Sequence, residues 1–216
     1  MMRAIIFANG QMQCLPKGIQ PLKTDDLIIA ADGGLRFCKQ ENIVPHLIIG
    51  DLDSVNETQL MEMKKLGVQV IQYPVDKDAT DLELSLQIAL DKGACEIIIL
   101  SALGARWDMT FSNVLLLAST LLVNVNARLV DHNQEIFCMK GPTKVDLIHR
   151  KGDNISLLPL SDCVKGMILQ GMKYPLNNEN LCLGTSRGLS NIVTDHKATI
   201  NIQSGVLLVC LNVNSD

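Results

Sequence analysis

Acidic side chains stand at four turns of this sequence, and each turn directly follows a short apolar run. The turns are Asp32-Gly33-Gly34, Gly50-Asp51-Leu52-Asp53-Ser54, the acid-rich segment Asp76 to Glu83, and Gly104-Ala105-Arg106-Trp107-Asp108. If the apolar runs are parallel strands, their carboxyl ends open into one crevice, where ligands bind in open α/β sheets. So many carboxylates in one crevice repel one another unless a cation is bound. The pattern therefore predicts Mg²⁺ and a phosphate-bearing substrate.

The Gly50 to Ser54 turn is the sharpest local signal. Asp51 and Asp53, two residues apart on a strand-to-helix turn, can both reach one metal ion. Ser54 can cap the following helix, together with Glu57, and the N-terminus of that helix also favours phosphate. The competing interpretation is an ordinary acidic helix start.

The third turn places four acids within the segment 76–83. Acids at a helix start are stabilised by the helix dipole, so a purely structural role competes with a functional one. Thr80 and Glu83 fit a capping box, which assigns Glu83 to structure. Asp78 and Asp81 are the better metal or substrate candidates.

The first and fourth turns add different chemistry. Asp32 stands beside two glycines that let a backbone approach a ligand closely. Arg106 adds a cation to an acidic rim and is suited to gripping phosphate with two hydrogen bonds. The alternative role of Arg106 is a salt bridge to one of the same acids. The four turns together are more specific than any one of them.

Composition narrows the function classes. The chain has 216 residues, 47% of them hydrophobic, and a net charge of −4 without a Lys/Arg cluster, so we expect no nucleic-acid surface. Seven scattered cysteines without a CxxC pair argue against zinc and for a reducing compartment, where buried cysteines act as small apolar residues. The four histidines form no metal or catalytic pattern. The start of the sequence resembles no signal peptide, and the stretch 114–123 is too short to span a membrane. We expect a cytoplasmic protein.

Strands and helices must position these turns. The apolar runs predict strands, the first ending before Asn9-Gly10, at 3–8, 27–31, 47–50, 68–73, 97–100 and 128–130. Helical patterns cover 35–42, 54–66, 81–92 and 110–123. The repeated alternation predicts a three-layer parallel-sheet, Rossmann-like α/β domain over residues 1–130.

The pattern changes beyond residue 130, where helical periodicity fades. Short apolar runs between turn residues predict strands at 135–139, 154–158, 164–169, 181–183, 189–193, 198–202 and 206–213. Short strands at this spacing predict a C-terminal antiparallel β-sandwich domain over residues 131–216.

The four motifs, in this order and spacing, resemble those of the bacterial thiamine pyrophosphokinase (thiamin diphosphokinase) family. The family pattern is ADGG, GDxDS, an acidic DxDxTDxE run and GxxGxRxD, followed by a Ser-Asn segment that Ser190-Asn191 matches. The resemblance spans most of the chain and is looser in the C-terminal part. Met109 and Ile192 depart from it, since relatives often have His and Glu there.

The resemblance implies the reaction ATP + thiamine → AMP + thiamine diphosphate. The hydroxyl of thiamine would attack the β-phosphorus of ATP, which is a problem of positioning and charge neutralisation. The implied metal ligands for Mg²⁺ are Asp32, Asp51, Asp53 and Asp81. The implied catalytic residues are Asp51, Asp53, Asp78, Asp81, Arg106 and Asp108. The implied ATP contacts are Asp32, Gly33, Gly34, Asp76, Thr80 and Gly104. Either Asp78 or Asp81 would orient or deprotonate the hydroxyl.

The resemblance also places thiamine in the second domain, at Ser190 and Asn191, and implies a homodimer built through that domain. The protein would bind ATP and thiamine, with no nucleic acid and no membrane as partner. On the sequence alone, a polar hairpin turn at Gly188 to Ile192 competes with a thiamine site.

Two other functions fit parts of the pattern. Asp51-x-Asp53-x-Val55 matches the nucleophile motif of haloacid-dehalogenase-type phosphatases, in which Asp51 would attack phosphorus. That motif normally lies on the first strand, whereas here it follows about the third, and the other motifs would have no role. The second alternative is a module that binds Mg-ATP without turnover.

Overall fold

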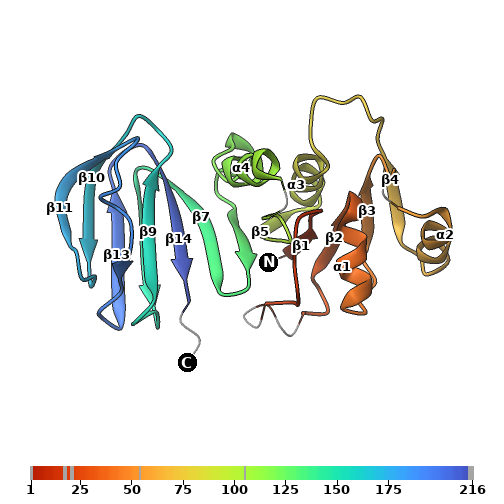
Figure 1. Cartoon of the computed structure of the whole chain (residues 1–216), viewed down its shortest axis with the longest axis horizontal. Coiled ribbons are helices and arrows are strands. Elements are labelled where there is room, and N and C mark those ends of the chain that lie inside the picture. Colours follow the sequence, from red (N-terminus) through yellow and green to blue (C-terminus); the bar gives the residue numbers. More distant parts are fainter. Residues whose placement is uncertain (1, 17–18, 20–21, 54, 105, 214–216) are drawn as a thin grey trace. The chain divides into compact units, whose positions relative to one another are not determined.

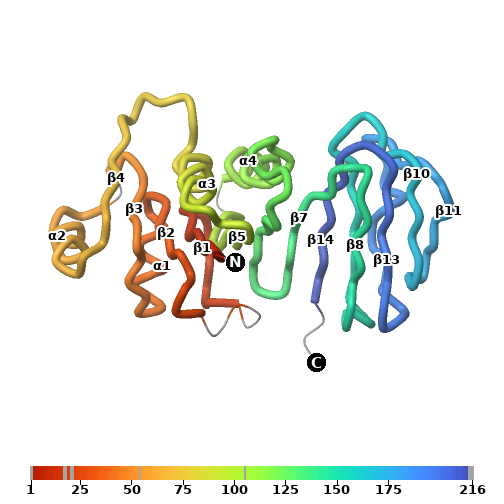
Figure 2. The backbone as a smooth tube through the Cα atoms, turned by 180° about the vertical axis from the view of Figure 1, so that it is seen from behind, coloured from red at the N-terminus to blue at the C-terminus, as the bar shows by residue number. Residues whose placement is uncertain are grey.

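The computed structural model describes residues 2–16, 19, 22–53, 55–104 and 106–213. It divides into two compact units, Met1–His132 and Asn133–Asp216, which we describe separately. Figures 1 and 2 show the elements of both units from opposite sides.

The first unit is built on a parallel sheet with the strand order β6-β5-β1-β2-β3-β4. Its strands are β1 (Met2–Phe7), β2 (Leu27–Ala31), β3 (Leu47–Gly50), β4 (Gln69–Gln72), β5 (Ala94–Leu100) and β6 (Asn126–Asp131). Its helices are α1 (Leu35–Gln40), α2 (Glu57–Lys65), α3 (Asp81–Asp91) and α4 (Trp107–Leu116), with 3-10 turns η2 (Asp32–Gly34) and η3 (Thr120–Leu122). All six strands that the sequence predicted are present.

Helices cover both faces of this sheet, because the central strands β1, β2 and β5 are apolar over most of their length. Side chains alternate between the faces of a strand, so Ile5 and Phe7 lie on one face, where they join a core with residues of α1 and α2. On the other face, α3 packs against β1, β2, β3 and β5. Figure 1 shows α1 beside the strands of the sheet. The three-layer α/β architecture expected from the sequence is confirmed.

Two helix boundaries differ from the prediction. Helix α2 begins at Glu57, because Asn56 is its cap and accepts a hydrogen bond from the Thr58 N–H; the predicted cap Ser54 lies outside the described residues. Helix α4 begins at Trp107 and ends at Leu116, and the predicted continuation toward residue 123 contains the separate turn η3. None of the helices that the structure describes is both long and apolar enough to cross a membrane.

The second unit contains two antiparallel sheets, with strand orders β12-β9-β14-β7 and β11-β10-β13-β8. Its strands are β7 (Gln134–Lys140), β8 (Thr143–Ile148), β9 (Asn154–Pro159), β10 (Cys163–Gln170), β11 (Leu176–Cys182), β12 (Asn191–Ile192), β13 (Lys197–Ile202) and β14 (Val206–Asn212). Apolar residues from both sheets, such as Leu157 of β9 and Ile200 of β13, share one core. The predicted β-sandwich is therefore confirmed.

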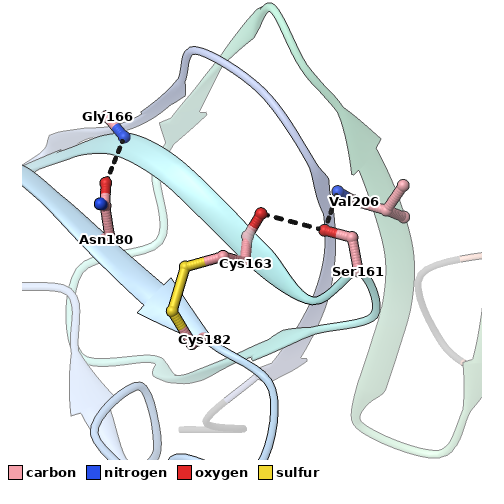
Figure 3. The surroundings of a disulfide bond; sticks show 6 residues. All are labelled: Ser161, Cys163, Gly166, Asn180, Cys182 and Val206. Atoms are coloured by element: carbon pink, nitrogen blue, oxygen red, sulfur yellow. Dashed lines mark hydrogen bonds between the residues drawn. A yellow bond between two sulfur atoms is a disulfide. The ribbon is translucent and has the colours of Figure 1, made fainter.

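Two cysteines of this unit contradict the expectation of unpaired thiols. Cys163 and Cys182 face each other across β10 and β11 and form a disulfide, with 4.0 Å between their Cα atoms (Figure 3). The Ser161 hydroxyl lies next to this bridge, where it donates to the Cys163 carbonyl and accepts from the Val206 N–H. Strand pairing brings the two residues together although 19 positions separate them. A pair at this separation has no CxxC spacing by which the sequence could predict it.

Candidate active site

A cleft of about 360 Å³ opens in the first unit, where β1, β2 and β5 end. Asn9 and Gly10 line it after β1, Asp32 after β2, and Ala102 and Gly104 after β5. The loop before α3 and one face of α4 complete the wall. In Figure 2 this loop, between β4 and α3, forms a long arch. The cleft lies at the carboxyl ends of parallel strands, the place that the four turns predicted.

The two glycines after Asp32 permit close packing on the end of β1. A Cβ on Gly34 would lie 2.0 Å from the Phe7 carbonyl oxygen, and one on Gly33 would lie 2.3 Å from Asn9 Oδ1. Asp32 itself has a left-handed φ of 48°. The Asn9 side chain donates a 2.9 Å hydrogen bond to Asp32 Oδ2. These contacts explain both glycines structurally, and their contact with ATP stays a prediction.

Three of the predicted metal ligands converge. Carboxylate oxygens of Asp32, Asp51 and Asp53 lie within 4.8 Å of one another. The Leu52 backbone between the two acids of the second motif is left-handed, with φ 67°. A non-glycine residue in this conformation costs free energy, and such strain concentrates at functional sites. The turn therefore lowers the stability of the folded state while it holds Asp51 and Asp53 in this arrangement.

Asp81, the fourth predicted ligand, lies beside the same group. A Cβ on Gly50 would lie 3.1 Å from Asp32 Cβ and 3.3 Å from Asp81 Cγ, so both acids crowd against this glycine. The Asp81 Oδ1 atom is buried and is paired with the Lys77 ammonium nitrogen. Burial, reinforced by the charges of Asp32 and Asp51, raises the pKa of Asp81, although Lys77 opposes this shift.

Lys77 supplies the positive charge at this site. Its ammonium nitrogen lies 3.1 Å from Asp81 Oδ1 and 3.8 Å from Asp51 Oδ2, and the side chain is only 14% exposed. The lysine offsets part of the repulsion between the carboxylates. The sequence alone predicts no role for this lysine.

The donor set fits a hard divalent cation. The converging groups are carboxylate oxygens, without sulfur or imidazole, and the buried Oδ1 of Asp81, paired with Lys77, lies beside them. Mg²⁺ prefers such ligands and is usually held by one or two carboxylates together with substrate phosphates. The residues present therefore fit the metal that the sequence implied.

The other acids of the third motif lie apart from this group. Asp76 and Asp78 are exposed in the loop before α3, and neither is among the residues that line the cleft. Thr80 lines the cleft and also caps α3 by accepting a hydrogen bond from the Glu83 N–H at 3.2 Å. The predicted cap is confirmed, whereas contact of Thr80 or Asp76 with ATP stays a prediction.

The fourth motif places an arginine at the rim. Arg106 lines the cleft just before α4, and Gly104 lies beside it with a φ of 84°. The guanidinium forms two hydrogen bonds with Asp108, at 3.1 and 2.5 Å, and both side chains are largely exposed. These bonds lower the pKa of the Asp108 carboxyl. Asp108 thus orients Arg106 and does not join the converging acids.

The predicted thiamine residues lie in the second unit. Asn191 is only 5% exposed, and its Oδ1 accepts from the N–H groups of Tyr174 and Ile192 while Nδ2 donates to the Tyr174 carbonyl. Ser190 is exposed, has a φ of 55°, and its N–H donates to the Ser156 hydroxyl. The side chain of Asn191 is therefore committed to holding the backbone of Tyr174.

Sequence reasoning missed three polar residues of the cleft. Besides Lys77, the cleft is lined by Asn9 and by Asn113, which is only 6% exposed. Asn9 was visible only as part of a turn signal, and Asn113 lies inside a helix. Their position at the ends of strands or on one helix face becomes apparent only when the sheet is assembled.

Comparison with known proteins gives the same family for both units. The profile "Thiamin pyrophosphokinase, catalytic domain" matches residues 20–129, and "Thiamin pyrophosphokinase, vitamin B1 binding domain" matches residues 142–207. Thiamine pyrophosphokinase of Bacillus subtilis is 31% identical over 207 residues, which cover 94% of this chain and 95% of the relative. "Thiamine pyrophosphokinase 3" of Oryza sativa is 27% identical over 74% of this chain and 62% of its own length.

Solved structures agree with this result. The crystal structure of the Bacillus subtilis enzyme superimposes with a TM-score of 0.87, at 28% identity, over the full length of both chains. A thiamin pyrophosphokinase family protein from Enterococcus faecalis gives a TM-score of 0.86 at 25% identity, covering 99% of this chain and 100% of the other. Thiamin pyrophosphokinase from Candida albicans shares the fold, with a TM-score of 0.81 at 18% identity.

Proposed function

Because the chain belongs to the thiamine pyrophosphokinase family and is an enzyme, we propose that it transfers pyrophosphate from ATP to the hydroxyl of thiamine, with Mg²⁺, giving thiamine diphosphate and AMP. The hydroxyl oxygen forms a bond to the β-phosphorus. The bond between that phosphorus and the oxygen bridging to the α-phosphate breaks, and AMP leaves with this oxygen. The hydroxyl proton passes to a carboxylate.

The observation that carries this proposal is the convergence of Asp32, Asp51 and Asp53 within 4.8 Å, with the buried Asp81 oxygen beside them. Asp32, Asp51 and Asp53 would hold Mg²⁺, which would supply positive charge to offset that of the phosphates. The residues that line the cleft at the ends of the strands are small, so the cleft has room for the nucleotide.

Two cations of the chain complete the phosphate site. Lys77 bridges Asp51 and Asp81. Its ammonium group could donate to a phosphate oxygen instead if these acids bind the metal ion. Arg106, held by Asp108, presents a planar fork at the rim of the cleft. Both side chains neutralise charge on the transferred group, which is the main task in such reactions.

Asp78 and Asp81 remain the candidates that orient or deprotonate the hydroxyl. The geometry favours Asp81, because it lines the cleft whereas Asp78 lies exposed in the loop. We further propose that Ser190 and Asn191 shape the thiamine site, that the active unit is a homodimer, and that the protein works in the cytoplasm.

One assay decides among the functions considered. The full-length protein is incubated with ATP, Mg²⁺ and thiamine, and nucleotides and thiamine esters are separated by chromatography. We expect AMP and thiamine diphosphate in equal amounts. Thiamine-independent release of phosphate with a phospho-aspartate at Asp51 would instead support the phosphatase, and tight ATP binding without any product would support the non-catalytic module.

A further inference from the structure

Asn113 is a buried polar side chain that the proposed mechanism does not use. It lies on α4, is 94% buried (6% exposed), and lines the cleft. Its Nδ2 donates a 2.7 Å hydrogen bond to the carbonyl oxygen of Ala102. Its Oδ1 has no hydrogen-bond partner among the described residues, yet it is not one of their fully buried unpaired atoms, so it reaches the solvent of the cleft. Water or a ligand can therefore complete this amide.

The orientation of this amide is fixed by the protein. Ala102 follows the end of β5 and is itself buried, so its carbonyl cannot turn away from Nδ2. The Thr110 hydroxyl, one turn earlier on α4, donates to the Gly104 carbonyl and ties the helix to the same loop. An acceptor at Oδ1 and the second hydrogen of Nδ2 are therefore left for a ligand in the cleft.

The surroundings of Asn113 suit a flat ring. Arg106, Met109 and Asn113 lie at i, i+3 and i+7, so they present one face of α4 to the cleft. Ala8 and Ala102 contribute small apolar surface to the same cleft. The converging carboxylates mark the phosphate region, whereas an apolar wall with one oriented amide is typical of sites for heterocycles.

We infer that Asn113 recognises the edge of a heterocycle on which an exocyclic amino group adjoins a ring nitrogen. Oδ1 accepts from the amino group, and the free hydrogen of Nδ2 donates to the ring nitrogen, as an asparagine does with adenine in nucleic-acid recognition. This inference rests on the proposed function, because both substrates named there carry such an edge: the adenine of ATP and the aminopyrimidine of thiamine. In either case, Asn113 is a specificity-determining residue.

The test replaces the amino group of each substrate by an oxo group. Inosine triphosphate is the oxo counterpart of ATP, and oxythiamine is that of thiamine. The oxo group would place an oxygen against Oδ1, and the amide cannot flip without losing its bond to Ala102. Affinities of the full-length protein for the four compounds are measured by calorimetry, with Mg²⁺ present for the nucleotides.

We expect wild-type protein to prefer the amino form of one pair by about tenfold to a hundredfold, the range for a paired amide contact. Asn113→Leu should lose at least about tenfold of this preference and leave the other pair unchanged. Ser112→Ala, on the same helix and outside the residues that line the cleft, is the matched control and should behave as wild type. A purely structural role would weaken both members of a pair equally and leave their ratio intact.

The pair that responds identifies the ligand. A change confined to the nucleotides assigns Asn113 to adenine, and one confined to the thiamines assigns it to the aminopyrimidine. Equal wild-type affinities within both pairs, an unchanged ratio in the variant, or no binding of any of the four compounds would overturn the inference. If Asn113→Leu fails to fold by circular dichroism, Asn113→Ser takes its place. Because binding is measured without turnover, an enzyme that makes thiamine diphosphate yet ignores these edges refutes this inference alone.

Discussion

Asp51 and Asp53 lie on a strained turn, with the left-handed Leu52 between them. We expect Asp51→Asn and Asp53→Asn each to lower turnover by at least about a hundredfold, since each removes a ligand charge from the proposed metal site. Their thermal stability without metal should hold or rise, because one repulsive charge leaves the group. Activity should also vanish with EDTA and return with Mg²⁺. Full activity of both variants, or indifference to chelation, would exclude this role.

The pKa of Asp81 gives a prediction for stability. Burial raises this pKa, so the folded state holds the ionised carboxylate less favourably than the unfolded chain. The resulting penalty is absent below the ordinary aspartate pKa of about 4 and is complete above the raised value. Asp81→Asn should therefore raise the melting temperature at neutral pH.

The same variant should show no such gain at pH 3, which scanning calorimetry at both pH values can measure. Asp78→Asn is the matched control, because Asp78 is exposed and outside the cleft lining; its melting temperature should not change at either pH. A stabilisation by Asp81→Asn that is equal at both pH values would contradict the electrostatic explanation.

Arg106 offers a test that separates chemistry from structure. Its ion pair with Asp108 is exposed, and exposed pairs contribute little to stability. Arg106→Ala should leave the melting temperature unchanged but lower kcat by about a hundredfold or more, as loss of a transition-state donor does. Arg106→Lys should restore activity only in part, because lysine lacks the planar fork.

Thiamine KM should change far less than kcat in both Arg106 variants. Asp108→Asn is informative beside them: Asn keeps one acceptor for the guanidinium and should reduce kcat less than Arg106→Ala does. Normal turnover with reduced stability in Arg106→Ala would favour the structural salt bridge over a catalytic role.

The proposed thiamine site depends on hydrogen bonds between the segments around Tyr174 and Asn191. The Asn191 side chain ties the Tyr174 backbone to β12, and the Lys173 N–H donates to the Ile192 carbonyl, so the two segments move as one. We expect Asn191→Ala to raise the thiamine KM and to leave ATP binding nearly unchanged. It should also cost about 1–3 kcal/mol in the free energy of unfolding, because buried backbone groups lose their partner.

Ser190, the exposed neighbour of Asn191, separates an effect on thiamine binding from an effect on stability. Ser190→Ala removes a hydroxyl that is not part of this network, so denaturant unfolding should be unchanged in that variant, while thiamine KM reports any direct contact. An Asn191→Ala enzyme with unaltered thiamine KM would remove the acceptor site from this segment, whatever the change in stability.

The sequence predicted elements well where one physical signal dominated. All six parallel strands and the cap at Thr80 followed from apolar runs and a capping box. It missed β8, whose apolar Val145 and Leu147 alternate with charged residues after Gly141-Pro142. Strand β11 was reduced to its apolar end, because its sequence LNNENLC is mostly polar and most of its residues are not buried.

The residues of the candidate site also divide into those that the sequence predicts and those that it does not. The acids Asp32, Asp51 and Asp53 were predictable, because each follows a strand in a sheet whose carboxyl ends must converge, whereas for the third motif the residues left Asp78 and Asp81 open. The ion pairs of Lys77, the free oxygen of Asn113 and the Cys163–Cys182 bridge were not, since they depend on packing and on strand register. Local patterns do not encode such contacts between distant residues.

At the scale of the whole molecule, we expect that one chain does not complete its own site. The converging acids belong to the first unit, whereas Ser190 and Asn191 belong to the second. The family resemblance implies that the acceptor residues of one subunit serve the nucleotide cleft of its partner. We therefore expect a homodimer in sedimentation experiments, and a mixture of two defective variants should recover activity.

The mixture combines Asp51→Asn with Asn191→Ala after joint refolding, at a thiamine concentration below the wild-type KM. In a mixed dimer, one cleft keeps Asp51 and faces the intact Asn191 of the other chain, so one of its two sites is whole. Because half of the dimers from an equal mixture are mixed, we expect about a quarter of wild-type activity, following from the twofold symmetry of such dimers. Each variant refolded alone is the control. If the site were completed within one chain, every chain in the mixture would carry a defect, and activity would stay at the mean of the two controls. A monomer in sedimentation would contradict the shared site directly.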